Sequence, residues 1–97
     1  GQNNQSTFAD ITNLYFDNTI WGFDIYLCAK ILASSNLYTN FHIRGVNKNG
    51  SWEIVKTYVG DDTGIQFHIT DFGQLQYTTP NFSAFTSCQF KYRAFVN

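Results

Sequence analysis

The triplet Asp62-Thr63-Gly64 has the residue types that aspartic proteases use for catalysis. In those enzymes an apolar strand delivers the aspartate into a dry two-fold interface, where two carboxylates share one proton. Here the triplet follows Gly60 and Asp61, a glycine and a second carboxylate, rather than an apolar strand. Glycine and aspartate are residues that favour turns. The sequence therefore predicts a turn between two strands at this position, and no protease.

The other residues with chemical potential also lack the spacing that a reactive site requires. His42 and His68 have no cysteine or carboxylate at a spacing typical of metal ligands. Asp61 and Asp62 offer oxygen ligands for calcium, but a solvated turn explains both carboxylates equally well. No Ser-His-Asp or Cys-His arrangement follows from the sequence. We therefore expect no enzymatic activity, no metal and no cofactor.

The composition is that of one small domain with low charge. The chain has 97 residues, a net charge of −1 and 13% charged residues, so it offers no electrostatic footprint for nucleic acid or an anionic membrane. No apolar run is long enough to insert into a membrane. Aromatic residues make up 19% of the chain, and together with abundant Asn and Thr they favour strands and turns. The lack of methionine favours a processed product or a piece of a longer protein.

Alternating apolar and polar side chains predict strands along most of the chain. In residues 18–36 five apolar side chains fall on one face, although a short helix through residues 27–35 is a competing interpretation. Asn49-Gly50 predicts a tight hairpin turn. The predicted strand segments are residues 18–36, 37–46, 51–59, 65–70, 75–79 and 88–96. We expect an all-β fold, an antiparallel β-sandwich or compact barrel of about seven to eight short strands.

Three further features bear on the organisation of the domain. Residues 1–12 are polar and are expected to form an arm or linker stub before a β-sandwich head domain in residues 13–97. Residues 51–59 carry apolar side chains on both faces, so we expect that strand to be covered on both sides. A disulfide between Cys28 and Cys88 would close a loop of about sixty residues and contribute roughly 4 kcal/mol. Free thiols buried in strands are the alternative.

The last part of the chain has a recognisable order of turns and strands. A Gly-Asp-Asp-x-Gly turn at Gly60 to Gly64 precedes an alternating strand, which is followed by the segments Gly73 to Thr78 and Phe90 to Ala94. This order resembles the C-terminal segments of phage tail fibres and related viral attachment proteins. The resemblance implies a β-rich head at the tip of a fibre, typically a homotrimer, that contacts a host surface. It implies no particular binding residues.

We therefore expect a non-enzymatic receptor-binding or adhesion head of a trimeric viral or phage-like fibre. Its partner would be a glycan or protein of the host cell surface, with neither nucleic acid nor membrane insertion involved. Its location would be extracellular or on the virion surface. Two alternatives remain open: a structural subunit of a fibre or capsid that assembles by strand exchange, and a monomeric lectin-like carbohydrate-binding module.

The expected binding site lies in loops, where side chains are free to meet a partner. Asp61, Asp62 and Asn81 offer hydrogen-bonding groups for sugar hydroxyls. Tyr38 and Phe82 offer rings for the apolar face of a sugar or for an anchor on a protein. The competing interpretation is that the carboxylates only solvate a turn and that Phe82 packs into the core or a trimer seam.

Overall fold

The alternating residues of the central segment form the middle of a four-stranded antiparallel sheet. The computed structural model describes residues 1–97 and contains no helix. The large sheet has the strand order β4-β3-β2-β7, and the small sheet has the order β1-β6-β5. An all-β antiparallel sandwich is confirmed, whereas the helix considered through residues 27–35 is wrong. The strands are β1 (Ala9–Tyr15), β2 (Gly22–Leu32), β3 (Leu37–Lys48), β4 (Ser51–Gly60), β5 (Gln66–Ile69), β6 (Gln74–Thr78) and β7 (Ser87–Val96).

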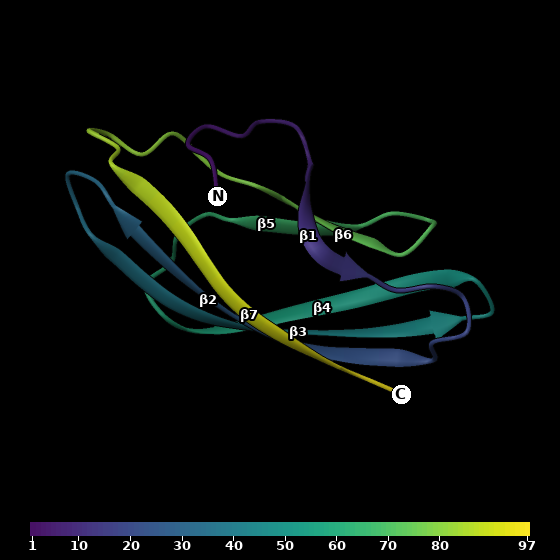
Figure 1. Cartoon of the computed structure of the whole chain (residues 1–97). Helices are drawn as coiled ribbons and strands as arrows, with labels where there is room; N and C mark the ends of the chain where they lie inside the picture. The colour runs from purple at the N-terminus through teal and green to yellow at the C-terminus, as the bar shows by residue number, and fades with distance from the viewer.

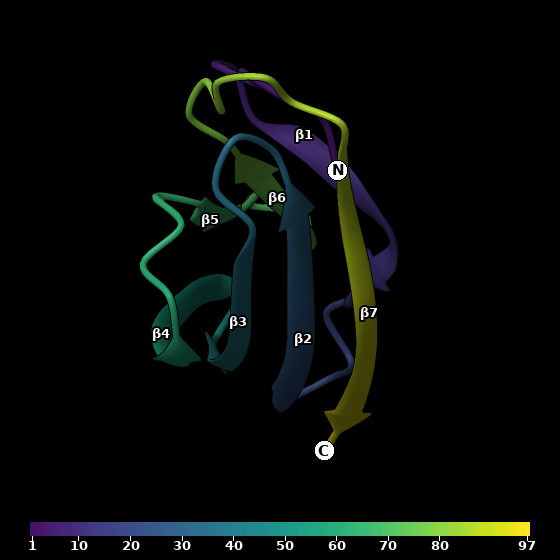
Figure 2. The ribbon, with the colours of Figure 1, turned by 90° about the vertical axis from the view of Figure 1, so that its left-hand side faces the viewer.

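The two sheets form two layers. Figure 1 shows the small sheet lying over one face of the large sheet, and Figure 2 shows β3, β2 and β7 side by side in the large sheet. Strands β2, β3 and β4 follow one another along the chain and pair with their neighbours. The last strand, β7, returns to pair with the free edge of β2. The large sheet therefore joins the middle and the end of the chain.

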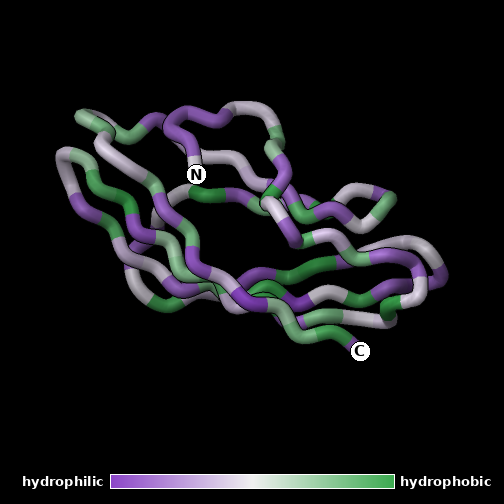
Figure 3. The backbone as a smooth tube through the Cα atoms, in the orientation of Figure 1, coloured by the Kyte–Doolittle hydropathy of each residue, from purple (hydrophilic) through white to green (hydrophobic).

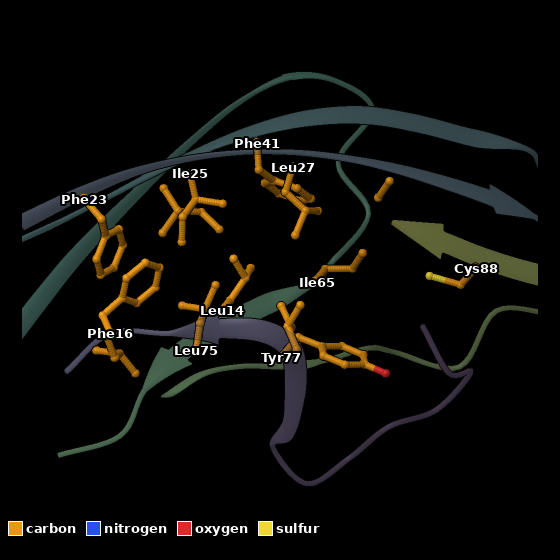
Figure 4. Packing of buried hydrophobic residues seen from close by; sticks show 14 of the residues in the cluster. Leu14, Phe16, Phe23, Ile25, Leu27, Phe41, Ile65, Leu75, Tyr77 and Cys88 are labelled. Atoms are coloured by element: carbon orange, nitrogen blue, oxygen red, sulfur yellow. The ribbon is translucent and has the colours of Figure 1, made fainter. Parts of the chain in front are cut away.

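The core lies between the layers and is built from the inward faces of both sheets. Figure 3 shows hydrophilic and hydrophobic positions alternating along the strands of the large sheet, as period-two burial requires. Figure 4 shows the buried side chains of both sheets meeting in the space between them. The largest fully buried side chains are Ile25, Leu27, Ile31, Ile43, Ile65 and Leu75. The inward face predicted for residues 23–31 is confirmed, because all five of its apolar side chains are buried.

An aromatic cluster closes the core near the start of β2. The rings of Phe16 and Phe23 stack with their centroids 4.2 Å apart, and Trp52 lies 5.4 Å from Phe23. Backbone hydrogen bonding holds the neighbouring turn against this cluster, since Phe16 N donates to Gly73 O at 2.8 Å. The β5–β6 turn is thereby fixed to the segment that leads from β1 to β2.

The predicted hairpin at Asn49-Gly50 is confirmed. Asn49 has a φ of 53° and Gly50 a φ of 92°, while Lys48 pairs with Ser51 across the turn. Positive φ at both central positions is what a type I′ turn requires, and Asn-Gly is the pair that adopts it most readily. The local sequence therefore determines the register of β3 against β4.

Strand β4 departs from the expected burial. It is an edge strand, and on its outer face Val55 and Val59 are 51% and 77% exposed. The expectation that residues 51–59 are covered on both sides is therefore wrong for the single chain. The apolar outer positions remain available to a partner.

The N-terminal residues lie along the sandwich. Strand β1 begins at Ala9 and so crosses the boundary suggested after residue 12. Ahead of it, Asn4 N donates to Pro80 O at 3.0 Å, and Gln5 N donates to Thr79 Oγ1 at 2.9 Å. Residues 2–5 are thus hydrogen-bonded to the loop between β6 and β7.

The two cysteines are both free. Cys28 is exposed on the outer face of the large sheet, whereas Cys88 is buried on the inner face. Two side chains on opposite faces of one sheet point apart and cannot be bridged. Burial raises the pKa of the Cys88 thiol, because desolvation disfavours the thiolate. The disulfide that the sequence left open is therefore not formed.

Candidate functional site

Three loops meet at the end of the sandwich where β2 ends and β3 begins. The loop after β2 contacts the β6–β7 loop, with Ser34 N donating to Ser83 O at 2.9 Å. The β4–β5 loop contacts the same β6–β7 loop, because Gly64 lies against the ring of Pro80. The loops in which the sequence placed the binding site therefore form one end of the molecule.

The polar residues expected in the site are already hydrogen-bonded within the chain. The Asp61 carboxylate accepts from Tyr38 N at 2.9 Å, and the Asp62 carboxylate accepts from Gly64 N at 3.1 Å. Asn81 Oδ1 accepts from the side-chain amide of Asn3 at 3.0 Å. Each side chain is nevertheless exposed, so its second oxygen or its amide group still faces solvent. The predicted turn at Asp62 lies between β4 and β5.

The two aromatic residues of the expected site differ in placement. Phe82 is half-buried, packs against the core and lies beside Phe85 with a centroid distance of 6.4 Å. Its backbone N donates to Asn3 Oδ1 at 2.7 Å, which links it to Asn81 through one side chain. Tyr38, by contrast, is exposed and adjoins Asp61. The structure thus brings Tyr38 to Asp61 and Phe82 to Asn81, but no hydrogen bond joins the two pairs.

A concave surface lies next to Tyr38 on the outer face of the large sheet. We call it the Cys28 hollow. Its volume is about 460 Å³, and its outward side chains are Cys28, Lys30, Tyr38, Asn40, Val59, Gln89 and Lys91. The strand register creates this hollow, because Cys28 stands between Asn40 on β3 and Lys91 on β7. The short side chain of Cys28 leaves a depression between longer neighbours.

A second hollow adjoins the first. It measures about 300 Å³ and shares Cys28, Asn40 and Lys91 with the Cys28 hollow. It also includes Tyr26, whose ring stacks on His42 with centroids 4.6 Å apart and planes at 14°. The two hollows therefore form a continuous depression over the central strands, with a ring near each end.

Basic side chains outnumber acidic ones on this outer face. Five of the six Lys and Arg residues lie there by strand alternation: Lys30, Arg44, Lys48, Lys91 and Arg93. Only Lys48 forms an ion pair, with Glu53 at 3.2 Å. Asp24 stands opposite Arg44 but is hydrogen-bonded to His42 at 2.8 Å. Five of the seven acidic residues lie in the small sheet or the loops: Asp10, Asp17, Asp61, Asp62 and Asp71. The net charge of −1 is therefore the sum of a mainly basic outer face and of mainly acidic loops and small sheet.

The sequence contains part of the signal for the Cys28 hollow. Alternation puts Cys28 and Lys30 on the solvent face of one strand and Gln89 and Lys91 on the solvent face of another. It does not show that these strands are neighbours. The pairing of β2 with β7 supplies that information and brings the two lysines to one surface.

Comparisons with known proteins add no assignment to this geometry. No family model matches the chain, and no curated protein or solved structure is significantly similar to it. No group of three or more His, Cys, Asp or Glu side chains lies close enough together to hold a metal ion. None of the chain's elements is a helix capable of spanning a membrane.

Proposed function

We propose that the chain is the non-enzymatic receptor-binding head of a trimeric viral or phage-like fibre, located on the virion surface or outside the cell. In this proposal it binds a glycan or protein of the host cell surface. The supporting observation is the Cys28 hollow, a concave surface centred on β2 and β3, the two strands of the large sheet that are paired on both sides. Ligand sites of about 300–1,000 Å³ with a few polar groups among apolar ones are typical of small-molecule recognition.

Tyr38 connects the loop site expected from the sequence with the Cys28 hollow. Its backbone N donates a hydrogen bond to the Asp61 carboxylate at 2.9 Å, while its side chain lines the hollow. Aromatic rings offer flat apolar faces, and the amides of Asn40 and Gln89 can both donate to and accept from hydroxyl groups. Rings with nearby amides favour a sugar ligand, so a glycan is the receptor class that we propose first.

Replacing Tyr38 tests the proposed function. We expect Tyr38→Ala to lower the affinity for the best-bound glycan of a cell-surface library by about fivefold, because a stacked ring contributes on the order of 1 kcal/mol. Tyr15→Ala is the matched control, because Tyr15 is 56% exposed against 52% for Tyr38 but lies on β1. Binding is measured by titration alongside the melting temperature. Equal affinity of Tyr38→Ala and the unmodified protein would refute the role of this surface.

Exposed apolar side chains suggest where subunits meet. Trp21 is 79% exposed, and Val46, Phe95 and Val96 are each about half exposed. They lie at the end of the large sheet away from the loops, with Val46 and Phe95 on the outer face and Val96, opposite the inward Phe23, on the inner face. Apolar patches of this kind are typical of subunit contacts. A homotrimer joined at this end would leave the Cys28 hollow open.

The mass in solution tests the assembly. We expect sedimentation to give the mass of three chains of 11.1 kDa, and Trp21→Ser combined with Val46→Ser to shift the population toward monomer. Val55→Ser, an exposed valine on the edge strand, is the comparison variant. A stable monomer at all concentrations would favour the lectin-like alternative, and open-ended assembly would favour a polymerising structural subunit.

A further inference from the structure

We infer that the Cys28 hollow binds an acidic sugar, meaning a sugar that carries a carboxylate or sulfate group. This inference rests on the proposed function, because it specifies the class of glycan that the head recognises. It goes beyond that function because it names an acidic ligand. The loops in which the sequence placed the binding site contain no basic residue and so do not predict such a ligand.

The first argument is the arrangement of cations at the hollow. Lys91 stands directly opposite Cys28 across the β2–β7 pair, and Lys30 is the next outward residue of β2. Arg93 follows Lys91 on the same face and lines the adjoining hollow. Like charges at neighbouring positions of a sheet repel each other, and none of these three cations forms an ion pair with an acidic side chain. A bound anion would remove the repulsion.

The carboxylates of the outer face and of the adjoining loop accept hydrogen bonds from other groups of the chain. Asp24 on the outer face is hydrogen-bonded to His42 at 2.8 Å, and Asp61 on the adjoining loop accepts from Tyr38 N. Neither forms an ion pair with Lys30 or Lys91. The two ammonium groups are therefore left for a ligand.

The second argument is the set of groups facing the lysines. Lys30 has Tyr38 directly opposite on β3 and Gln89 directly opposite on β7, while Cys28 has Asn40 opposite. A ligand with its anionic group at Lys30 and Lys91 would have a ring for its apolar face and two amides for its hydroxyl groups. A sugar ring with one anionic substituent combines these three features.

The number of cations argues against a nucleic acid. Proteins that bind nucleic acid through its backbone commonly neutralise about 6–10 phosphates. This face has four unpaired cations, and the whole chain has a net charge of −1. Four cations are too few for a nucleic-acid backbone of that kind, but they are enough for the anionic group of a largely neutral sugar.

Titration with three defined probes tests the inference: sialyllactose, a heparin tetrasaccharide and neutral lactose. We expect at least one acidic probe to bind at least about tenfold more tightly than lactose, and to weaken as the salt concentration rises. Lys30→Gln combined with Lys91→Gln should abolish that preference. Lys48→Gln with Arg44→Gln is the control of equal charge change, and it should retain the preference because neither residue lines the Cys28 hollow.

Blocking the floor of the hollow provides an independent measurement. Iodoacetamide should react with exposed Cys28 before buried Cys88, and the added group should prevent binding of the acidic probe. Cys28→Ser should bind the probe both before and after the same treatment. Unimpaired binding after complete modification of Cys28 would overturn the inference.

The outcomes separate the inference from the proposed function. Equal affinity for lactose and the acidic probes, unchanged by the lysine variants, would refute the acidic ligand and leave glycan recognition standing. A tighter complex with a single-stranded oligonucleotide, lost in the same variants, would replace the sugar with a nucleic acid. Failure to bind any probe, any glycan of a library or host cells would refute both. The melting temperature of each variant shows whether lost binding reflects lost folding.

Discussion

Gly73→Ala is expected to lower the free energy of unfolding by about 3–5 kcal/mol, a large part of the roughly 5–15 kcal/mol available to a domain. Gly73 has a φ of 89°, a conformation that costs a residue with a Cβ about 1–2 kcal/mol. A Cβ at this position would also overlap the backbone carbonyl oxygen of Phe16. Backbone cannot move aside as a flexible side chain can, and Phe16 N is itself bonded to Gly73 O.

Gly50→Ala separates the conformational cost of a positive φ from the steric overlap with backbone. Gly50 has a similar φ of 92°, but the nearest atom to an added Cβ is Asn18 Oδ1 at 3.8 Å. This variant should therefore lose only the conformational cost, about 1–2 kcal/mol. Urea unfolding followed by far-UV circular dichroism measures both variants. Equal losses in the two variants would show that the turn at Gly73 moves freely away from Phe16.

Leu27→Ala should lower the free energy of unfolding by about 3–5 kcal/mol and the melting temperature by at least about 12 °C. Leu27 has no exposed surface and lies on the inward face of β2, in the middle of the large sheet. Its removal leaves a cavity that strands paired on both sides cannot close. Thermal unfolding followed by circular dichroism gives the measurement.

Ile25→Val provides the graded comparison for Leu27→Ala. Ile25 is equally buried on the same strand, and the loss of one methylene should cost about 0.5–1.5 kcal/mol. If Leu27→Ala cost no more than Ile25→Val, the core between the sheets would not be as closely packed as the structure shows.

The parts of the fold that follow from local sequence were predictable. The inward face of β2 follows from period-two alternation, and the β3–β4 register follows from the Asn49-Gly50 turn. The irregularity in β1 does not follow in this way. The register shifts between Asp10 and Tyr15, and the side chain of Gln74 donates to Ile11 O at 3.0 Å inside that stretch. A side chain from a different strand stabilises this bulge, and nothing within residues 9–15 predicts it.

The candidate site shows the same division between local and long-range information. The turn at Asp62 and the exposure of Tyr38 follow from their immediate neighbours. Phe82 is half-buried because it packs on the core, while residues at the N-terminal end of the chain hold its loop. Lys30 and Lys91 become neighbours only through the pairing of β2 with β7. Alternation in one strand cannot specify which other strand will lie beside it.

The pairing of β2 with β7 also sets the order in which the domain can be completed during synthesis. β2 finds β3 immediately after it in the chain, but its other edge pairs with the last strand, and β1 pairs only with β6. Because translation releases the N-terminal strands first, β1 and one edge of β2 stay without partners until the late strands emerge. An open edge is a template for association with other chains. The nascent polypeptide is therefore most prone to aggregation during the interval that ends when β7 docks.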